Sequence, residues 1–174
     1  MSDAGGQDGP LDQSFRLAMR RLAGTVTVVT VEHGGQRHGT TATAVTSLSM
    51  SPPSLLVCFN RDSRLHGLLS GAEVFCVNIL HADNVEVAQL FSRPVASSER
   101  FASGRWCAEH GRPPSLEGAQ ASIQCAKEQE IDYASHTIFI GRVLAVRIRE
   151  DIAPLLYCNG AYAGAAVLSD KDNH

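Results

Sequence analysis

Positive charge is scarce in this chain, which excludes one large class of partners. The 174 residues include 15 Lys and Arg against 18 Asp and Glu, so the formal net charge is −3. Proteins that bind nucleic acids need a dense basic surface to neutralise phosphates. The only basic cluster, Arg16, Arg20 and Arg21, fits the solvent face of a helix. We therefore expect no nucleic-acid partner.

Long apolar runs are missing as well. No window is apolar enough to span a bilayer, because the longest uncharged stretch is interrupted by Ser, Thr and the pair Pro52-Pro53. The opening MSDAGGQDGP has acidic residues where a secretory signal has basic ones. We expect a disordered arm at residues 1–10, one domain at 11–168, a tail at 169–174, no membrane contact and a cytoplasmic location.

The common nucleotide and metal motifs are also absent. No G-x-G-x-x-G follows a strand, and there is no P-loop, H-E-x-x-H or G-x-S-x-G. A nucleotide, if one binds, is not held by a standard βα phosphate loop. The five cysteines are scattered, with no pairs at metal-ligand spacing, so we expect reduced thiols and no metal site.

What the sequence does contain is a series of strand patterns. One amphipathic helix is expected over residues 11–22, where apolar side chains recur at helical spacing before Gly24. Strands are expected at residues 25–32, 39–49, 54–60, 74–80, 121–131 and 137–149. Six strands with short connections favour an antiparallel barrel over a βαβ fold.

Local signals refine this pattern. A short helix is expected at residues 64–70, and a capping-box pair, Asp83 and Glu86, predicts the start of another helix. Residues 94–118 are rich in Gly and Pro and are expected to form a loop. A phase change near Gly141 predicts a bulge or bend in the last strand.

The uncharged segment at residues 39–60 is the most informative part of the chain. Along it Thr41, Thr43, Ser47 and Ser49 share one parity, while Ala42, Ala44 and Leu48 share the other. Side chains alternate faces along a strand, so one face would be rich in hydroxyls and the other small and apolar. Such a surface suits the close approach of a flat, polar-edged ligand. It is equally typical of a half-exposed, threonine-rich strand.

The order of motifs resembles the short-chain flavin reductases. Residues 15–23 read F-R-x-A-M-x-x-L-A, residues 39–49 read G-x-T-A-x-A-V-x-S-x-S, and residues 52–60 read P-P-x-L-L-V-C-x-N. Later matches are Leu90-Phe91-Ser92, Glu99-Arg100-Phe101, Trp106, the strip at residues 111–119, His136, and the closing segments at residues 154–157 and 160–162. No single motif is specific, but the matches keep their order over nearly the whole chain.

This resemblance implies a fold and an activity. The fold is a six-stranded antiparallel split β-barrel with Greek-key topology and a few flanking helices, assembled as a homodimer. The activity is reduction of FAD or FMN by NADH or NADPH, with the reduced flavin passed to a partner monooxygenase. Hydride transfer belongs to the two cofactors, so no side chain is expected to be an obligatory catalytic acid or base.

The resemblance also implies which residues contact the cofactors. Those expected at the flavin are Thr41, Ala42, Thr43, Ala44, Ser47, Leu48, Cys58, Phe59, Asn60, Ser63, His66, Phe91, Ser92, Arg100 and Phe101. Arg100 is expected to pair with phosphate because its planar fork matches phosphate oxygens, unless it forms a surface salt bridge instead. His66 equally fits a water-facing position at a helix start, and Phe91 fits helix-to-core packing.

His136 and Tyr162 are expected at the nicotinamide, with His136 in a loop between two strands. A different class of function stays open at this point: a non-catalytic split barrel that holds flavin or haem as a sensor or electron carrier. A purely structural domain without a cofactor would show no stabilisation by flavin.

Overall fold

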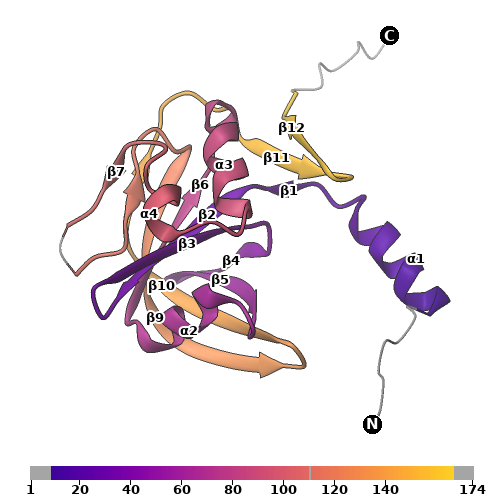
Figure 1. Ribbon diagram of the computed structural model, residues 1–174, viewed down its shortest axis with the longest axis horizontal. Helices are drawn as coiled ribbons and strands as arrows, with labels where there is room; N and C mark the ends of the chain where they lie inside the picture. The colour runs from indigo at the N-terminus through magenta and orange to yellow at the C-terminus, as the bar shows by residue number, and fades with distance from the viewer. Residues whose placement is uncertain (1–8, 110, 167–174) are drawn as a thin grey trace.

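The protein is built around one antiparallel sheet of seven strands (Figure 1). The computed structural model describes residues 9–109 and 111–166. The predicted tail, most of the predicted arm and the last two residues of the predicted domain lie outside those residues. The sheet order is β3-β2-β6-β9-β10-β5-β4. Its strands are β2 (Thr27–His33), β3 (Gln36–Ala42), β4 (Val45–Met50), β5 (Pro53–Asn60), β6 (Val74–Ile79), β9 (Ala121–Tyr133) and β10 (His136–Ile148).

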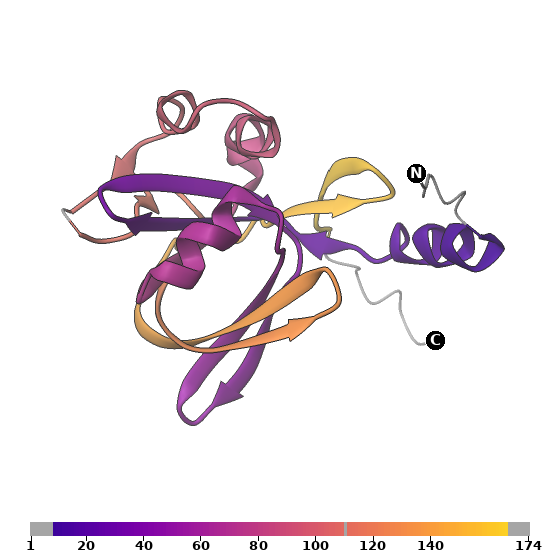
Figure 2. The same cartoon turned by 60° about the horizontal axis from the view of Figure 1, so that its bottom comes forward.

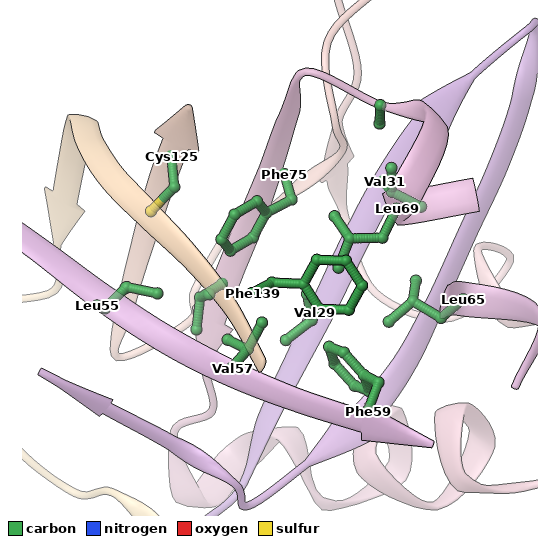
Figure 3. Close-up of a cluster of buried hydrophobic side chains, with 12 residues drawn as sticks. Val29, Val31, Leu55, Val57, Phe59, Leu65, Leu69, Phe75, Cys125 and Phe139 are labelled. Atoms are coloured by element: carbon green, nitrogen blue, oxygen red, sulfur yellow. The ribbon is translucent and has the colours of Figure 1, made fainter. Parts of the chain in front are cut away.

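The sheet curls around a hydrophobic core (Figure 2). Inward side chains from four strands meet there, including Val29, Val57, Phe75 and Phe139, all fully buried (Figure 3). Leu65 and Leu69 of α2 (Arg64–Gly71) close one side of this core. Alternating burial along β5 and β10 follows from the two-residue period of a strand with one face packed inward. The predicted antiparallel split barrel is confirmed, with one more main strand than predicted.

Two smaller sheets and further helices flank the main sheet. One sheet joins β1 (Gly24–Thr25), β11 (Leu155–Cys158) and β12 (Ala161–Gly164), and the other pairs β7 (Trp106–Cys107) with β8 (Ser115–Leu116). The helices are α1 (Pro10–Met19), α3 (Val85–Ser92) and α4 (Ser97–Arg100), with a 3₁₀ turn, η1 (Ala82–Asn84). Figure 1 shows α1 standing away from the barrel, and none of its residues is buried.

The predicted strand at residues 39–49 is wrong, because the chain changes sheet edge within it. β3 ends at Ala42, opposite Thr27, the first residue of its partner β2. Beyond Ala42 no paired residue is left on β2, and the chain next pairs Val45 with Val57 of β5. β3 and β4 therefore form the two opposite edges of the main sheet, joined by Thr43 and Ala44 alone. The alternation of hydroxyls does not describe one continuous surface.

Other boundaries also differ from the predictions. The strand expected at 25–32 divides into β1 and β2, and the loop expected at 94–118 contains α4, β7 and β8. The expected capping box is wrong: Nδ1 of His81 accepts a hydrogen bond from the Asp83 amide at 3.1 Å, and Oδ1 of Asn84 accepts one from the His81 amide. None of the helices that the structure describes is long and apolar enough to cross a membrane.

The irregularity predicted near Gly141 is confirmed. The β9–β10 register shifts between Ile140 and Gly141, where one extra residue of β9 is accommodated. A Cβ atom on Gly141 would lie 2.5 Å from Cζ of Phe75, a distance that no real side chain tolerates. Glycine is therefore required here because the backbone passes directly over a core aromatic ring.

Candidate functional site

A pocket of about 520 Å³ lies where β3 ends. Its walls come from the end of β3, from α3 and from the β11–β12 hairpin. The residues that line it are Val26, Thr41, Ala42, Thr43, Gln89, Ser92, Arg93, Tyr157, Gly160 and Tyr162. Five residues predicted from the sequence, Thr41, Ala42, Thr43, Ser92 and Tyr162, therefore converge on one hollow.

Small side chains keep the main chain accessible at this pocket. Thr41 and Ala42 are half-buried, whereas Thr43 and Ala44 are exposed. The carbonyl of Ala42 accepts a hydrogen bond from Oγ1 of Thr27 at 2.7 Å, which fixes the strand end. β1 passes so close that a Cβ on Gly24 would lie 2.9 Å from Cβ of Thr43. The result is a rigid wall of small groups, suited to a flat ligand that hydrogen-bonds through its edge.

The crossing between the two sheet edges joins this pocket to β5. The amide of Cys58 donates to the carbonyl oxygen of Ala44 at 3.1 Å. Cys58 lies two residues before Asn60, so the predicted positions on β5 continue the strip that starts at Thr41. A ligand longer than the pocket can follow this strip.

A second cluster of predicted residues lies at the end of β5. Oγ of Ser63 accepts from the amide of His66 at 3.2 Å and caps α2. Oδ1 of Asn60 accepts from the amide of Asp62 at 2.8 Å. Nε2 of His66 lies 2.9 Å from Oγ1 of Thr137 on β10. These side chains define the shape of the turn and surround its exposed face.

His136 lies in the same cluster but not in a loop, as the sequence had suggested. It is the first residue of β10, directly opposite Asn60 on β5. Its side chain is exposed, with Nδ1 at 2.9 Å from Oγ of Ser135. Long pairing of β9 with β10 extends both strands to the hairpin turn and so includes His136 in the sheet. Tyr162 lies at the other pocket, and no contact joins the two residues among the described ones.

Ser47 and Leu48 follow β4 away from the first pocket. Ser47 borders a separate, mostly apolar pocket of about 400 Å³ between β4, β5 and the ends of β2 and β6. Leu48 is exposed on the edge strand. The edge change at Thr43 and Ala44 is what separates Ser47 and Leu48 from Thr41.

Arg100 holds several backbone segments together. It is buried, and its guanidinium donates to four backbone carbonyl oxygens: those of Gly39, Phe91, Arg93 and Val95. Burial, and secondarily the charge of Arg64, lower the pKa of this guanidinium from its ordinary value. These four contacts give Arg100 a structural role, and its contact with a phosphate stays a prediction.

Three aromatic residues predicted at the flavin pack within the protein, and their contact with a flavin stays a prediction. Phe59 and Phe91 are buried, and Phe101 is only partly exposed. Phe91, Phe101 and Trp106 pack as a three-ring cluster with centroids 5.1 to 5.3 Å apart. Such edge and tilted contacts stabilise a core beyond simple burial. The L-F-S and E-R-F segments thus hold α3 and α4 on the barrel and leave Ser92 at the pocket.

Five pocket residues were not among the predicted site residues: Val26, Gln89, Arg93, Tyr157 and Gly160. Arg93 is the only charged residue among those that line the pocket within the described chain. It follows Ser92 directly, and that adjacency was a signal that could have found it. Tyr157 stacks edge-on against Tyr162 across β11 and β12, with ring centroids 5.5 Å apart. This pair forms one aromatic wall of the pocket.

Burial shifts the pKa of three side chains of the barrel toward their neutral forms. Burial, followed by the charges of Arg100 and Arg64, lowers the pKa of His38 to about 4. Burial raises the pKa of the Cys76 and Cys125 thiols to about 12, so neither is a nucleophile. Among the residues that the structure describes, no group of three His, Cys, Asp or Glu side chains could hold a metal ion.

Comparisons with known proteins agree with this arrangement. Residues 19–166 match the model of the "Flavin reductase like domain". The reductase component of the FADH(2)-dependent resorcinol hydroxylase of Rhizobium sp. (strain MTP-10005) is 44% identical over 156 residues, covering 88% of this chain and 87% of that protein. FMN reductase (NADH) RutF of Cronobacter sakazakii is 35% identical over 150 residues, covering 86% and 90%.

A solved structure gives the same relationship in three dimensions. The NADH:FAD oxidoreductase SgcE6 of Streptomyces globisporus, determined with NAD and FAD fragments, superposes with a TM-score of 0.83 at 28% identity. The match covers 97% of this chain and all of that one. The family model spans most of the chain and the relatives align over nearly their full length. This protein therefore belongs to the flavin reductase family.

Proposed function

We propose that this protein is an NAD(P)H:flavin oxidoreductase that reduces FAD or FMN and releases the reduced flavin to a separate oxygenase. The observation that carries the proposal is the pocket beside Thr41, Ala42 and Thr43, where small residues leave a rigid main chain accessible. A flavin supplies hydride acceptance when bound. The protein's part is to hold two flat rings in contact and to exclude water from between them.

The residues divide this work between two regions. Thr41, Ala42, Thr43 and Ala44 provide the wall against which the flavin ring lies. Ser92, Arg93 and Gln89 provide polar groups around that wall. The cluster of Asn60, Ser63 and His66 continues the strip for the flavin side chain. His136, in the cluster at the end of β5, and Tyr162, at the pocket beside Thr43, are each proposed to contact the nicotinamide substrate.

The resemblance to a hydroxylase reductase component supports an oxygenase as partner. Names of relatives also support both flavins and NADH as ligands. All five cysteines are free, which fits a reducing compartment and the proposed cytoplasmic location.

The test mixes purified protein with NADH or NADPH and a tenfold excess of FAD, FMN or riboflavin, and follows nicotinamide absorbance at low oxygen. Catalytic loss of NADH or NADPH, many equivalents per protein, is the expected result. Stoichiometric loss would instead identify a flavin carrier, and no flavin-induced rise in melting temperature would exclude a flavin site.

We also propose that the protein is a homodimer. Large apolar side chains are exposed along one end of the barrel: Leu144, Val146, Ile148 and Ile152. Val146, Ile148 and Ile152 border a mostly apolar hollow of about 560 Å³. A patch of this kind is typical of a subunit interface. Light scattering should give twice the chain mass, and Val146→Asp with Ile148→Asp should give the monomer mass. Tyr133→Asp, an exposed aromatic at the other end of β9, is the control.

A further inference from the structure

Three side chains from three elements form a hydrogen-bond chain behind the β5–α2 turn. Nε2 of His66, on α2, lies 2.9 Å from Oγ1 of Thr137, on β10. Oγ1 of Thr137 donates to Oδ1 of Asp132, on β9, at 2.5 Å. Thr137 is fully buried, so its hydroxyl has no access to water.

Counting protons shows which group donates and which accepts in each of these hydrogen bonds. A hydroxyl has one proton to donate, and a carboxylate can only accept. Because Thr137 gives its proton to Asp132, its oxygen must accept from His66, and Nε2 of His66 must carry a hydrogen. Arg61 lies 3.7 Å from Oδ2 of Asp132 and supports the carboxylate charge. In the neutral imidazole the other nitrogen, Nδ1, then carries a lone pair and no hydrogen.

The His66 ring is held in place but open on one side. Its edge packs against Phe139, with ring centroids 5.4 Å apart. The ring is half-buried. Among the described residues, the buried side-chain polar atoms without a partner are Oγ of Ser70 and Nε2 of His81. Nδ1 of His66 is not among them, and no described residue forms a hydrogen bond with it, so this nitrogen is not sealed in the core.

We propose that Thr137 and Asp132 are positioning residues that fix the His66 tautomer, so that Nδ1 accepts a hydrogen bond from a ribityl hydroxyl of the flavin. This inference rests on the proposed function. It assigns a chemical preference to the site, because an Nδ1 atom that can only accept selects a hydroxyl donor and offers no hydrogen to a phosphate oxygen. From the sequence alone, the residues of this turn could contact either the ribityl hydroxyls or the phosphate of a flavin.

The first test reads the tautomer without any ligand. In the full chain labelled with ¹⁵N-histidine at pH 8, the expected spectrum shows His66 with hydrogen on Nε2 and none on Nδ1. Thr137→Val should convert His66 to a mixture of tautomers, and Thr137→Ser should restore the single form. A His66 ring that carries hydrogen on Nδ1 in the wild type would overturn the proposal.

The second test uses three flavins that differ only in their tails: lumiflavin, riboflavin and FMN. Loss of one neutral hydrogen bond should raise the KM for riboflavin and FMN alike by about fivefold in His66→Phe and Thr137→Val. The KM values for lumiflavin and for NADH should not change, and Thr137→Ser should behave as wild type. An increase for FMN without one for riboflavin would mean that His66 binds phosphate, which contradicts the proposal.

The two failures can be told apart. If the wild type neither binds nor reduces any flavin, the proposed function is wrong and the ribityl assignment with it, whatever the tautomer. If the wild type reduces flavins but Thr137→Val changes only the melting temperature, the positioning role is wrong while the reductase activity stands.

Discussion

Nη1 of Arg100 lies 2.5 Å from the carbonyl oxygen of Gly39 and ties α4 to the edge strand β3, across 61 positions of the chain. The contact between Arg100 and Gly39 depends on position 39 being a glycine. A side chain on Gly39 would meet Cε1 of Phe91 at 2.7 Å, so only glycine lets the strand approach the ring and its neighbouring arginine. This contact explains why a conspicuous arginine near the site is a structural group.

Arg100→Lys should therefore destabilise the fold more than it affects flavin binding. An ammonium cannot reproduce a planar fork that serves four carbonyls, and a buried carbonyl left unpaired costs about 1–3 kcal/mol. We expect urea denaturation to show a loss of about 2 kcal/mol or more. Arg93→Lys, at an exposed position, should change the unfolding free energy by less than about 0.5 kcal/mol. Unchanged stability with a raised flavin KM in Arg100→Lys would support the predicted phosphate contact.

Gly24→Ala should distort the flavin wall from behind. The added Cβ would lie 2.9 Å from Cβ of Thr43, and relief of that contact must push Thr43 toward the pocket. We expect the flavin KM to rise several-fold and the unfolding free energy to fall by about 1–3 kcal/mol, as in other overpacked sites. Thr43→Gly in the same chain removes the contacted atom and should recover stability, a non-additive effect.

Gly67→Ala serves as the matched control, because a Cβ there meets no atom within 4 Å. Alanine inside helix α2 should stabilise by about 0.5–1 kcal/mol. An equal rise in flavin KM in both glycine variants would contradict the proposed role of the Gly24–Thr43 contact.

His136→Ala should raise the nicotinamide KM by more than it lowers kcat, because hydride transfer does not pass through the side chain. The flavin KM should stay within twofold of wild type, measured by varying each substrate at saturation of the other. Tyr133→Ala, at the position paired with His136 across the hairpin, is the control. A collapse of flavin affinity at unchanged nicotinamide KM would assign His136 to the flavin instead.

Acid should destabilise the protein in part through His38. Its pKa is lowered from 6.5 to about 4 in the folded chain. Between these values the unfolded chain binds a proton that the folded chain does not, so stability falls as pH falls from about 6.5 toward 4. The unfolding free energy, measured at pH 7.5 and pH 5, should drop less in His38→Gln than in wild type. Identical drops would exclude His38 as a contributor.

The sequence could predict elements whose signal is local. The strands around Phe75 and Val57 have patterns that only an inward face explains, and Gly141 interrupts an otherwise regular alternation. The family resemblance supplied Thr41, Ala42, Thr43, Ser92 and Tyr162 as candidate ligand contacts, and the fold brings these five residues to one pocket. The sequence motifs gave only the order of these residues along the chain. Their proximity in space is a result of the fold.

The features that the sequence could not predict have a common cause, since each depends on a partner far away in the chain. The alternation of small and hydroxyl residues continues through Thr43 and Ala44, and only the end of β2 at Thr27 forces the edge change. The carbonyls that occupy Arg100 come from β3, α3 and the loop after it. His81 is not a typical capping residue, and its use depends on burial at the base of the barrel.

The crossing at Thr43 and Ala44 joins the two edges of the main sheet. The two strands that it joins are the outermost members of the sheet, so each has one side without a strand neighbour. A flat ligand bound at this crossing would contact both edge strands, β3 and β4. Binding of the ligand would therefore slow amide hydrogen exchange along β3 and β4 together, because it links the two open edges of the sheet.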